Sequence, residues 1–264
     1  MIGISQFTLN ELDFYSSINL LRSEKFNKIS LYYHSLLKED LETVKIFLMK
    51  NNIKPINLAA AGISTQSYTA WVEDVLNAIC MASELNIKDV VVIASPMGCD
   101  NIDTSLLHLK KGINEVLPVA KEKQIRILIE PLHPIMRSLS VLTNFNDGLT
   151  FVKDYHPEQV GLVLDLFHCW WDSTLESLIP EAIPYIGVVQ ISDWRGDLNT
   201  PLERNFIGDG MIPIRNYLNI LNKSGYKGQF EIEIISDSWK ADRQTMLQTI
   251  HEEIEFVEDY LYAK

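Results

Sequence analysis

The stretch “SYTAWVEDVLNAICMASELN” (67–86) lies between two short apolar runs, “PINLAA” (55–60) and “DVVVIAS” (89–95). Its apolar positions recur at steps of three and four residues: Trp71, Val75, Ala78, Ile79 and Ala82. That spacing predicts an amphipathic helix. The flanking runs are too short for helices and are bounded by polar residues, which predicts buried strands. Residues 55–95 therefore predict a strand–helix–strand unit, the building block of parallel α/β folds.

The same alternation continues along the whole chain. The candidate strands are “IGISQF” (2–7), “KISLYY” (28–33), “PINLAA” (55–60), “DVVVIAS” (89–95), “RILIEP” (126–131), “GLVLDL” (161–166), “GVVQIS” (187–192) and “FEIEII” (230–235). A final helix is expected over 241–262. Eight such units in 264 residues predict one (β/α)₈ barrel domain over 1–264. A doubly wound open sheet is the alternative, and it is disfavoured because no GxGxxG motif follows the first strand.

Composition and charge narrow the functional classes. Hydrophobic residues make up 47% of the chain, which is enough for a sizeable core. The net charge is −12, and the acids form no long block. Because an acidic surface repels phosphate backbones, we do not expect a nucleic-acid partner.

The cysteines and the N-terminus bear on location. Cys80, Cys99 and Cys169 form no CxxC pair, and a sparse, odd set favours reduced thiols and a cytoplasmic protein. “MIGISQFTL” shows no basic leader followed by a long apolar region, so we do not expect a signal peptide. No apolar run approaches about 18 residues, so neither a transmembrane helix nor a membrane partner is expected.

Polar side chains stand at the ends of four successive predicted strands, where the active sites of (β/α)₈ barrels lie. Since side-chain direction alternates along a strand, each of three polar residues shares a face with an aliphatic one: Leu128 with Glu130, Val163 with Asp165, and Val188 with Gln190. If the aliphatic members fill the barrel, Glu130, Asp165, Gln190 and Glu233 meet at its mouth. Glu231 shares the face of Glu233 but lies deeper, which leaves open a structural hydrogen-bonding role.

Four such residues together favour a metal site. A single acid at a strand end is more often a helix cap, but three carboxylates in an apolar barrel would repel one another without a cation. Oxygen ligands suit hard divalent ions. We therefore expect Glu130, Asp165, Gln190 and Glu233 to bind Mn²⁺, with Mg²⁺, Co²⁺ and Zn²⁺ as alternatives.

Several blocks of the chain together resemble a known family, the sugar phosphate isomerase/epimerase superfamily of xylose isomerase-like TIM barrels. The blocks are “IEPLHP” (129–134), “LDLFHCWWD” (164–172), “VQISDW” (189–194), “GDGMIP” (208–213) and “EIEIISDSW” (231–239). The resemblance covers essentially the whole chain. It implies a metal-dependent isomerase or epimerase that acts on a ketose, inosose or keto-sugar through an enediolate.

The resemblance also assigns roles to the residues at the strand ends. It implies Glu130, Asp165 and Glu233 as metal ligands, with Gln190 at the position where the family has a histidine. Glutamine is a neutral and weaker donor than imidazole, so this departure could lower metal affinity. Glu130 and Glu233 would also act as acid and base on the two sides of the reacting carbon.

Five further residues are candidates for substrate binding. By the resemblance, His168 would hydrogen-bond a substrate hydroxyl, and Arg195 would stabilise developing negative charge. Asp193 stands beside Arg195 at the end of the seventh predicted strand. Trp170 and Trp194 could pack against the C–H face of a sugar, although packing between loops is an equal alternative.

His133 in “EPLHP” separates two chemistries. It is either a loop histidine bonded to the backbone or a general base near the substrate. A branch of the superfamily, the C-glycoside deglycosidases, looks similar around this motif. Those enzymes eliminate an aglycone from an oxidised 3-keto-glycoside and pair with a small second subunit. A metal-dependent lyase, of this type or an inosose dehydratase, with His133 as its base is therefore the alternative function.

The expected partner is a small carbohydrate, and a homo-oligomer is expected as in related barrels. Asp209 within “GDGMIP” argues against an anionic ligand there, so a non-phosphorylated substrate is favoured. An endonuclease IV-like role is discouraged by the acidic chain and its six histidines. A non-catalytic sugar-binding barrel is discouraged by Glu130, Asp165 and Glu233, while Gln190 leaves it open.

Overall fold

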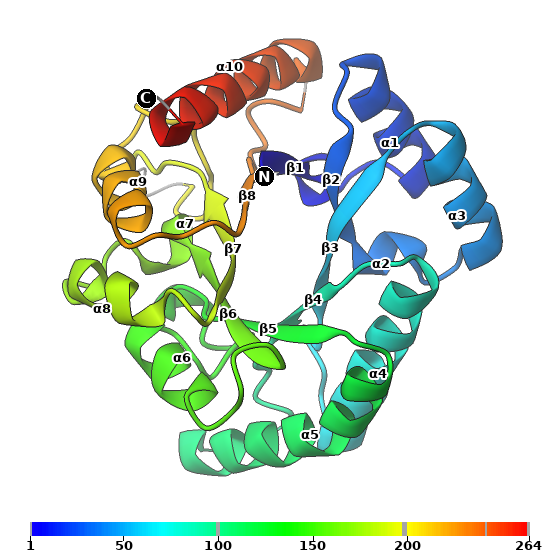
Figure 1. The fold of residues 1–264 in the computed structure, drawn as a ribbon, viewed down its shortest axis with the longest axis vertical. Coiled ribbons are helices and arrows are strands. Elements are labelled where there is room, and N and C mark those ends of the chain that lie inside the picture. The colour runs from blue at the N-terminus through cyan, green and yellow to red at the C-terminus, as the bar shows by residue number, and fades with distance from the viewer. Residues whose placement is uncertain (1, 99–100, 197–199, 241, 263–264) are drawn as a thin grey trace.

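The structure is a computed structural model that describes residues 2–98, 101–196, 200–240 and 242–262. Its eight parallel strands close into a barrel in sequence order (Figure 1). They are β1 (Ile2–Ser5), β2 (Lys28–Tyr32), β3 (Lys54–Ala61), β4 (Asp89–Ile93), β5 (Arg126–Glu130), β6 (Val160–Asp165), β7 (Ile186–Ile191) and β8 (Gln229–Ile232). Ile4 of β1 pairs with Ile232 of β8 and closes the ring. The predicted (β/α)₈ fold is confirmed.

Helices surround the barrel (Figure 1). They are α1 (Phe14–Ser23), α2 (Tyr33–Leu36), α3 (Leu41–Lys50), α4 (Tyr68–Glu84), α5 (Ile102–Glu122), α6 (Phe145–Val152), α7 (Leu166–Cys169), α8 (Leu175–Ala182), α9 (Ile214–Lys223) and α10 (Arg243–Tyr262), with 3₁₀ turns η1 (Gln6–Leu9) and η2 (Pro134–Met136). The helix predicted over 67–86 is α4, and the final predicted helix is α10. Ser67 caps α4 by accepting a hydrogen bond from the backbone of Ala70.

All eight predicted strands are present, and all except β3 end one to three residues earlier than expected. The difference arises because the chain turns at once at the barrel mouth. The side chain of Ser5 accepts from the backbone N–H of Phe7 and starts η1. Asp165 does the same for Phe167 and starts α7. Glu233 consequently lies one residue beyond β8.

An aliphatic layer fills the barrel below the mouth. It consists of Val91, Leu128, Val163 and Val188, packed against Ala59 and Ala60. Leu128, Val163 and Val188 stand two residues before Glu130, Asp165 and Gln190, so strand alternation places the polar side chains above this layer. The apolar floor therefore leaves the polar groups at the C-terminal end of the strands.

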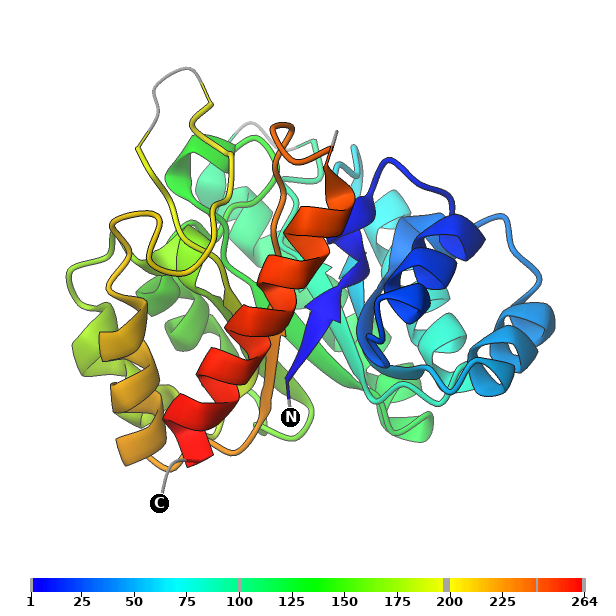
Figure 2. The ribbon, with the colours of Figure 1, turned by 90° about the horizontal axis from the view of Figure 1, so that it is seen from above.

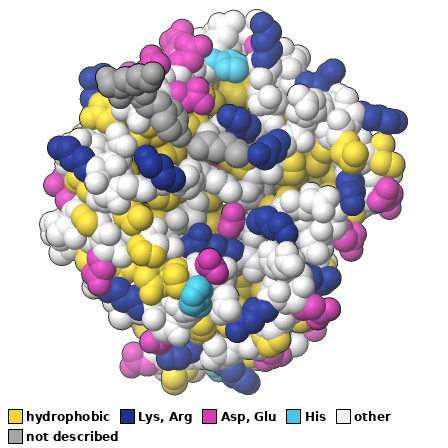
Figure 3. Space-filling model, in the orientation of Figure 1, with side chains coloured by type: hydrophobic (Ala, Val, Ile, Leu, Met, Phe, Trp, Pro, Cys, Tyr) yellow, Lys and Arg dark blue, Asp and Glu magenta, His cyan; other side chains and the backbone are white. Residues whose placement is uncertain are grey.

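The two ends of the barrel differ. At the C-terminal end of the strands, the segments that follow β7 and β8 project beyond the barrel (Figure 2). On the opposite face, which carries the chain ends, basic and acidic side chains are interspersed (Figure 3). None of the described helices is long and apolar enough to cross a membrane. Cys80 and Cys169 are free thiols, and Cys99 lies outside the described residues.

Candidate active site at the barrel mouth

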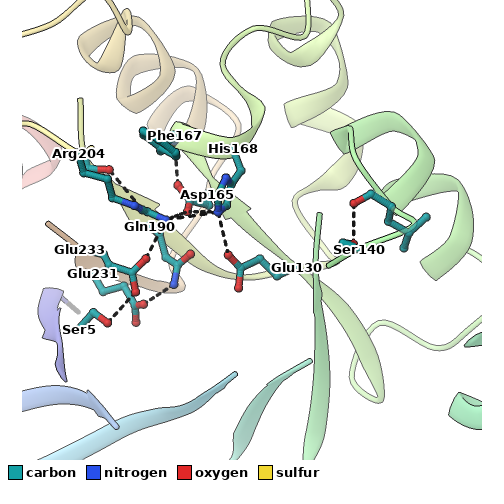
Figure 4. Close-up of polar contacts among 12 residues, drawn as sticks. Ser5, Glu130, Ser140, Asp165, Phe167, His168, Gln190, Arg204, Glu231 and Glu233 are labelled. Carbon is teal, nitrogen blue, oxygen red and sulfur yellow. Dashed lines mark hydrogen bonds and ion pairs between the residues drawn. The ribbon is translucent and has the colours of Figure 1, made fainter. Parts of the chain in front are cut away.

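A cavity of about 210 Å³ lies at the C-terminal end of the strands. Its polar lining includes Ser5, Glu130, His168, Gln190, Arg204 and Glu233. Figure 4 shows these side chains converging from different strands and from the segments that follow β6 and β7. Asp165 is fully buried behind this lining. The structure thus brings together the four residues expected as metal ligands.

Arg204 lies at the centre of these acids. Its Nη2 is 2.8 Å from Asp165 Oδ2 and 3.0 Å from Glu233 Oε2, and its side chain is only 3% exposed. The guanidinium also stacks 4.7 Å above the ring of Phe167. The backbone N–H of Arg204 donates to Ile235 beyond β8 at 2.9 Å, which fixes the segment that delivers it. One buried positive charge therefore bridges two of the carboxylates.

The acids of the mouth have perturbed pKa values. Burial, and then the charges of Asp165 and Glu233, raise the pKa of Glu130 well above its ordinary value. Burial also raises the pKa values of Asp165 and Glu233, and Arg204 opposes both shifts. Glu130 has no such ion pair with Arg204 in the described chain, so it is the acid of this group that most readily keeps a proton.

His168 lies directly over two of these acids. Its Nε2 is 3.6 Å from Asp165 Oδ2 and 3.8 Å from Glu130 Oε1. The short helix α7 begins at the end of β6 and returns position 168 over position 165. Burial, followed by the charge of Arg204, holds the pKa of His168 well below its usual range. The imidazole is therefore neutral, and its Nδ1 has no hydrogen-bond partner within the described residues.

A buried network orients Gln190. Its Nε2 donates to Glu231 Oε1 at 2.6 Å, and Asn57 Nδ2 donates to Glu231 Oε2 at 2.7 Å. Ser30 in turn donates to Asn57 Oδ1. Burial raises the pKa of Glu231 to about 7. The network bears out the hydrogen-bonding role left open for Glu231, and it leaves Gln190 Oε1 without a partner among the described residues.

The donor set fits a divalent cation. One ligand atom from each of Glu130, Asp165 and His168 lies within 4.8 Å of the others. Carboxylates with one neutral imidazole are common ligands of such ions, and the unpartnered carbonyl oxygen of Gln190 is a further donor. However, Arg204 already contacts Asp165 and Glu233, so a cation has to share or displace those contacts.

Two residues expected to bind substrate have other partners. Arg195 is 58% exposed, pairs with Asp209 at 2.9 Å and is absent from the cavity lining. Asp193 is buried, and its carboxylate accepts from the backbone of Trp194, Ile212 and Gly208. Asp193 thus fixes the loop after β7, and the arginine in the cavity is Arg204. The sequence pattern did not indicate Arg204, because it stands in that loop. Its only sequence signal is its position shortly before “GDG” (208–210).

The two tryptophans pack beside the mouth. The rings of Trp170 and Trp194 are 5.5 Å apart, and neither residue lines the cavity. Trp194 Nε1 donates to Pro201, and the carbonyl of Trp170 accepts from Tyr217. The structure therefore favours the alternative of packing between loops over direct stacking on a sugar in this cavity.

His133 caps η2. Its Nδ1 accepts from the backbone N–H of Ile135 at 3.2 Å, and its ring packs edge-on against Trp171. Burial lowers the pKa of His133. The residue is absent from the cavity lining. This is the backbone-bonded alternative of the sequence analysis, and the geometry offers no support for a lyase base at this position.

The closed parallel barrel is a TIM barrel. Its buried carboxylates lie at the C-terminal ends of the strands, where TIM-barrel enzymes have their active sites. Residues 18–260 match the xylose isomerase-like TIM barrel family, and the chain belongs to that family. An inosose isomerase from Halalkalibacterium halodurans is 24% identical over 74% of this chain and 71% of its own.

Two solved structures share the fold. The IOLI protein with bound zinc has a TM-score of 0.83 at 16% identity and covers 100% of this chain and 99% of its own. D-psicose 3-epimerase from Clostridium cellulolyticum H10, solved with D-tagatose, has a TM-score of 0.79 at 17% identity, covering 98% of this chain and 99% of its own. Relatives of this barrel thus include sugar isomerases and epimerases.

Proposed function

We propose that the chain is a sugar isomerase or epimerase that moves a proton at the carbon beside the carbonyl of a small, non-phosphorylated keto-sugar or inosose. The placement of Glu130 and Glu233 in the lining of one cavity at the barrel mouth carries the proposal (Figure 4). The inosose isomerase and D-psicose 3-epimerase among the relatives support the same reaction class.

Glu233 is suited to be the base. Ser5 Oγ donates to its Oε1 at 2.7 Å, and Arg204 lies 3.0 Å from its Oε2. Hydrogen bonds and a nearby positive charge favour the ionised carboxylate, despite burial. An ionised Glu233 can accept the proton that leaves the substrate carbon.

Glu130 is suited to be the acid. Burial and the neighbouring acids raise its pKa well above the ordinary value, so of the acids at the mouth it most readily takes up a proton and can pass it on. After Glu233 has removed a proton, Glu130 can deliver one to the other side of the carbon or to the neighbouring oxygen. The two glutamates thereby divide the roles that the resemblance implies for them.

Arg204 takes the electrostatic role that the sequence analysis gave to Arg195. Its guanidinium lines the cavity and carries a buried charge, so it can stabilise the negative oxygens of an enediolate. Neutral His168 also lines the cavity and can hydrogen-bond a substrate hydroxyl.

We further propose that Glu130, Asp165 and His168 hold a divalent cation, with Gln190 and Glu233 as additional donors. The zinc in the IOLI structure supports a divalent ion, and the mixed nitrogen and oxygen donors suit Zn²⁺ as well as Mn²⁺. When bound, the ion would polarise the carbonyl and the adjacent hydroxyl and lower the barrier to proton removal.

The test is exchange of substrate hydrogen with D₂O, measured by NMR on a panel of free ketoses and inososes with Zn²⁺ or Mn²⁺ present. Glu130→Gln and Glu233→Gln should each slow exchange by about 10²- to 10⁴-fold. Glu158→Gln, an exposed glutamate outside the cavity, is the matched control and should exchange at the wild-type rate. Absence of exchange on every compound of the panel would overturn the proposal.

A further inference from the structure

The arginine of the cavity is delivered by a loop and not by a strand. The antiparallel bridge between Asp193 and Asn205 joins the loop that carries Arg204 to the end of β7. Because loops are more mobile than the elements they connect, a guanidinium that contacts Glu233 at 3.0 Å needs further support. The side chain of the preceding residue, Glu203, provides such support.

Glu203 joins the loop after β7 to the loop after β8. Its Oε1 accepts hydrogen bonds from the hydroxyls of Ser236 and Ser238 and, at 3.1 Å, from the backbone N–H of Ser238. The rings of Phe206 and Trp239 pack 5.0 Å apart between the same two loops. Burial raises the pKa of Glu203, but the bonds from the two serines outweigh burial and lower it to about 2. The acceptor is therefore an ionised carboxylate near neutral pH.

Glu203 itself lies outside the reacting site. It is absent from the lining of the barrel-mouth cavity, and it lines a different cavity of about 270 Å³ together with Trp194 and Trp239. A substrate held at the carboxylates is therefore out of its reach, whereas Arg204, the next residue, contacts two of those carboxylates directly. An effect of Glu203 on the reaction consequently passes through Arg204.

We propose that Glu203 is a positioning residue: by joining the loop after β7 to the loop after β8, its carboxylate holds the guanidinium of Arg204 between Asp165 and Glu233. The inference rests on the proposed function, in which Arg204 stabilises the enediolate. Since the three bonds from the serines all end on Oε1, a glutamine at position 203 can keep them, whereas a methionine of similar length has no oxygen acceptor.

The experiment is a double-mutant cycle on the exchange of substrate hydrogen with D₂O. Glu203→Met removes hydrogen bonds to a charged group and should lower kcat by about 10- to 150-fold, and Glu203→Gln should recover most of that loss. In the Arg204→Met background, Glu203→Met should cost nothing further, because the group that Glu203 positions is already gone. Additive losses in the double variant, or equal losses in the two Glu203 variants, overturn the inference.

A second measurement does not depend on activity. Because the side chain of Arg204 is buried, the NMR signal of its Nε–H should exchange slowly with solvent, and the absence of this signal from Arg204→Met identifies it. The solvent exchange of this N–H should be about 10- to 150-fold faster in Glu203→Met and close to the wild-type rate in Glu203→Gln.

Asp40→Ala is the matched control for a lost carboxylate acceptor. Asp40 is exposed, lies outside the cavity, and accepts from the backbone and the hydroxyl of Thr43 at the start of α3. Its replacement should lower Tm while kcat and the Arg204 signal stay at their wild-type values. An Arg204 signal that is as protected in Glu203→Met as in wild type overturns the inference, even if ketoses exchange. If wild type exchanges no ketose but the Arg204 signal responds as expected, the proposed function fails and the positioning of Arg204 by Glu203 stands.

Discussion

The buried guanidinium of Arg204 at the barrel mouth gives the sharpest prediction. Arg204→Met keeps an unbranched apolar side chain but removes the guanidinium, which stacks on Phe167 and contacts Asp165 at 2.8 Å and Glu233 at 3.0 Å. Breaking a buried ion pair on one side typically costs about 3–5 kcal/mol, because the remaining charge is left without a partner. For a chain of this length about 1 kcal/mol corresponds to about 2 °C, so Tm should fall by about 6–10 °C.

The assay is calorimetric or circular-dichroism melting at pH 7.5 in EDTA. Arg195→Met is the matched control: its partner Asp209 lies 2.9 Å away, but the side chain is 58% exposed. Exposed pairs contribute about 0–1 kcal/mol, so this Tm should move by less than about 2 °C. An equally small change in Arg204→Met would refute the reasoning that a buried charge holds the acids together.

The same pair of proteins tests competition with a cation. A divalent ion at about 100 times its Kd stabilises the folded state by about 2.7 kcal/mol. In wild type, part of that gain is lost because the contacts of Arg204 with Asp165 and Glu233 must yield. Addition of Zn²⁺ or Mn²⁺ should therefore raise Tm more in Arg204→Met than in wild type. Equal Tm shifts in the two proteins would contradict competition between the divalent ion and Arg204 for Asp165 and Glu233.

Three other perturbations probe the fold around the site. Burial raises the pKa of Glu253 to about 8, so the folded state holds an extra proton between about pH 4.5 and 8. The folding free energy of wild type therefore weakens as pH rises through that window, by up to about 1.4 kcal/mol per pH unit. Urea melts should show Glu253→Gln gaining on wild type from pH 5 to pH 8, and parallel curves would argue against it. Glu231→Gln places an amide donor against the amide donors of Gln190 and Asn57. Thermal melts should show a loss of about 1–3 kcal/mol in the free energy of unfolding, and an unchanged Tm would exclude this effect. Gly112→Ala brings a methyl group to 2.6 Å from the buried ring of Trp71, and a Tm that does not fall by about 2–6 °C would mean that α4 and α5 can separate without cost.

The barrel could be predicted because its signals are local. Strand alternation is a property of neighbouring residues, so Leu128 and Glu130 could be assigned to one face from the sequence alone. The barrel topology then brings the ends of β5–β8 together, which is why Glu130, Asp165 and Gln190 could be grouped without a structure.

Loop residues could not be placed in that way. Arg195 stands four residues after β7, yet the loop turns it outward to Asp209. Arg204 stands much further along, and only tertiary contacts return it to the mouth. These are the antiparallel bridge between Asp193 and Asn205 and the bond from its own N–H to Ile235. Such contacts join segments with no sequence periodicity, so the sequence pattern indicated Arg195, whereas the arginine that lines this cavity is Arg204.

The charge balance of the mouth divides its acids into two kinds. Arg204 compensates Asp165 and Glu233, and the amides of the buried network satisfy Glu231, whose pKa is raised to about 7. Glu130 has neither partner, so its charge depends on whatever enters the cavity. A cation or a substrate hydroxyl that reaches Glu130 meets no competing guanidinium there, whereas at Glu233 it competes with Arg204. Occupancy of the site should therefore act on Glu130 first, and proton release on Zn²⁺ or Mn²⁺ binding should be smaller in Glu130→Gln than in wild type while persisting in Arg204→Met.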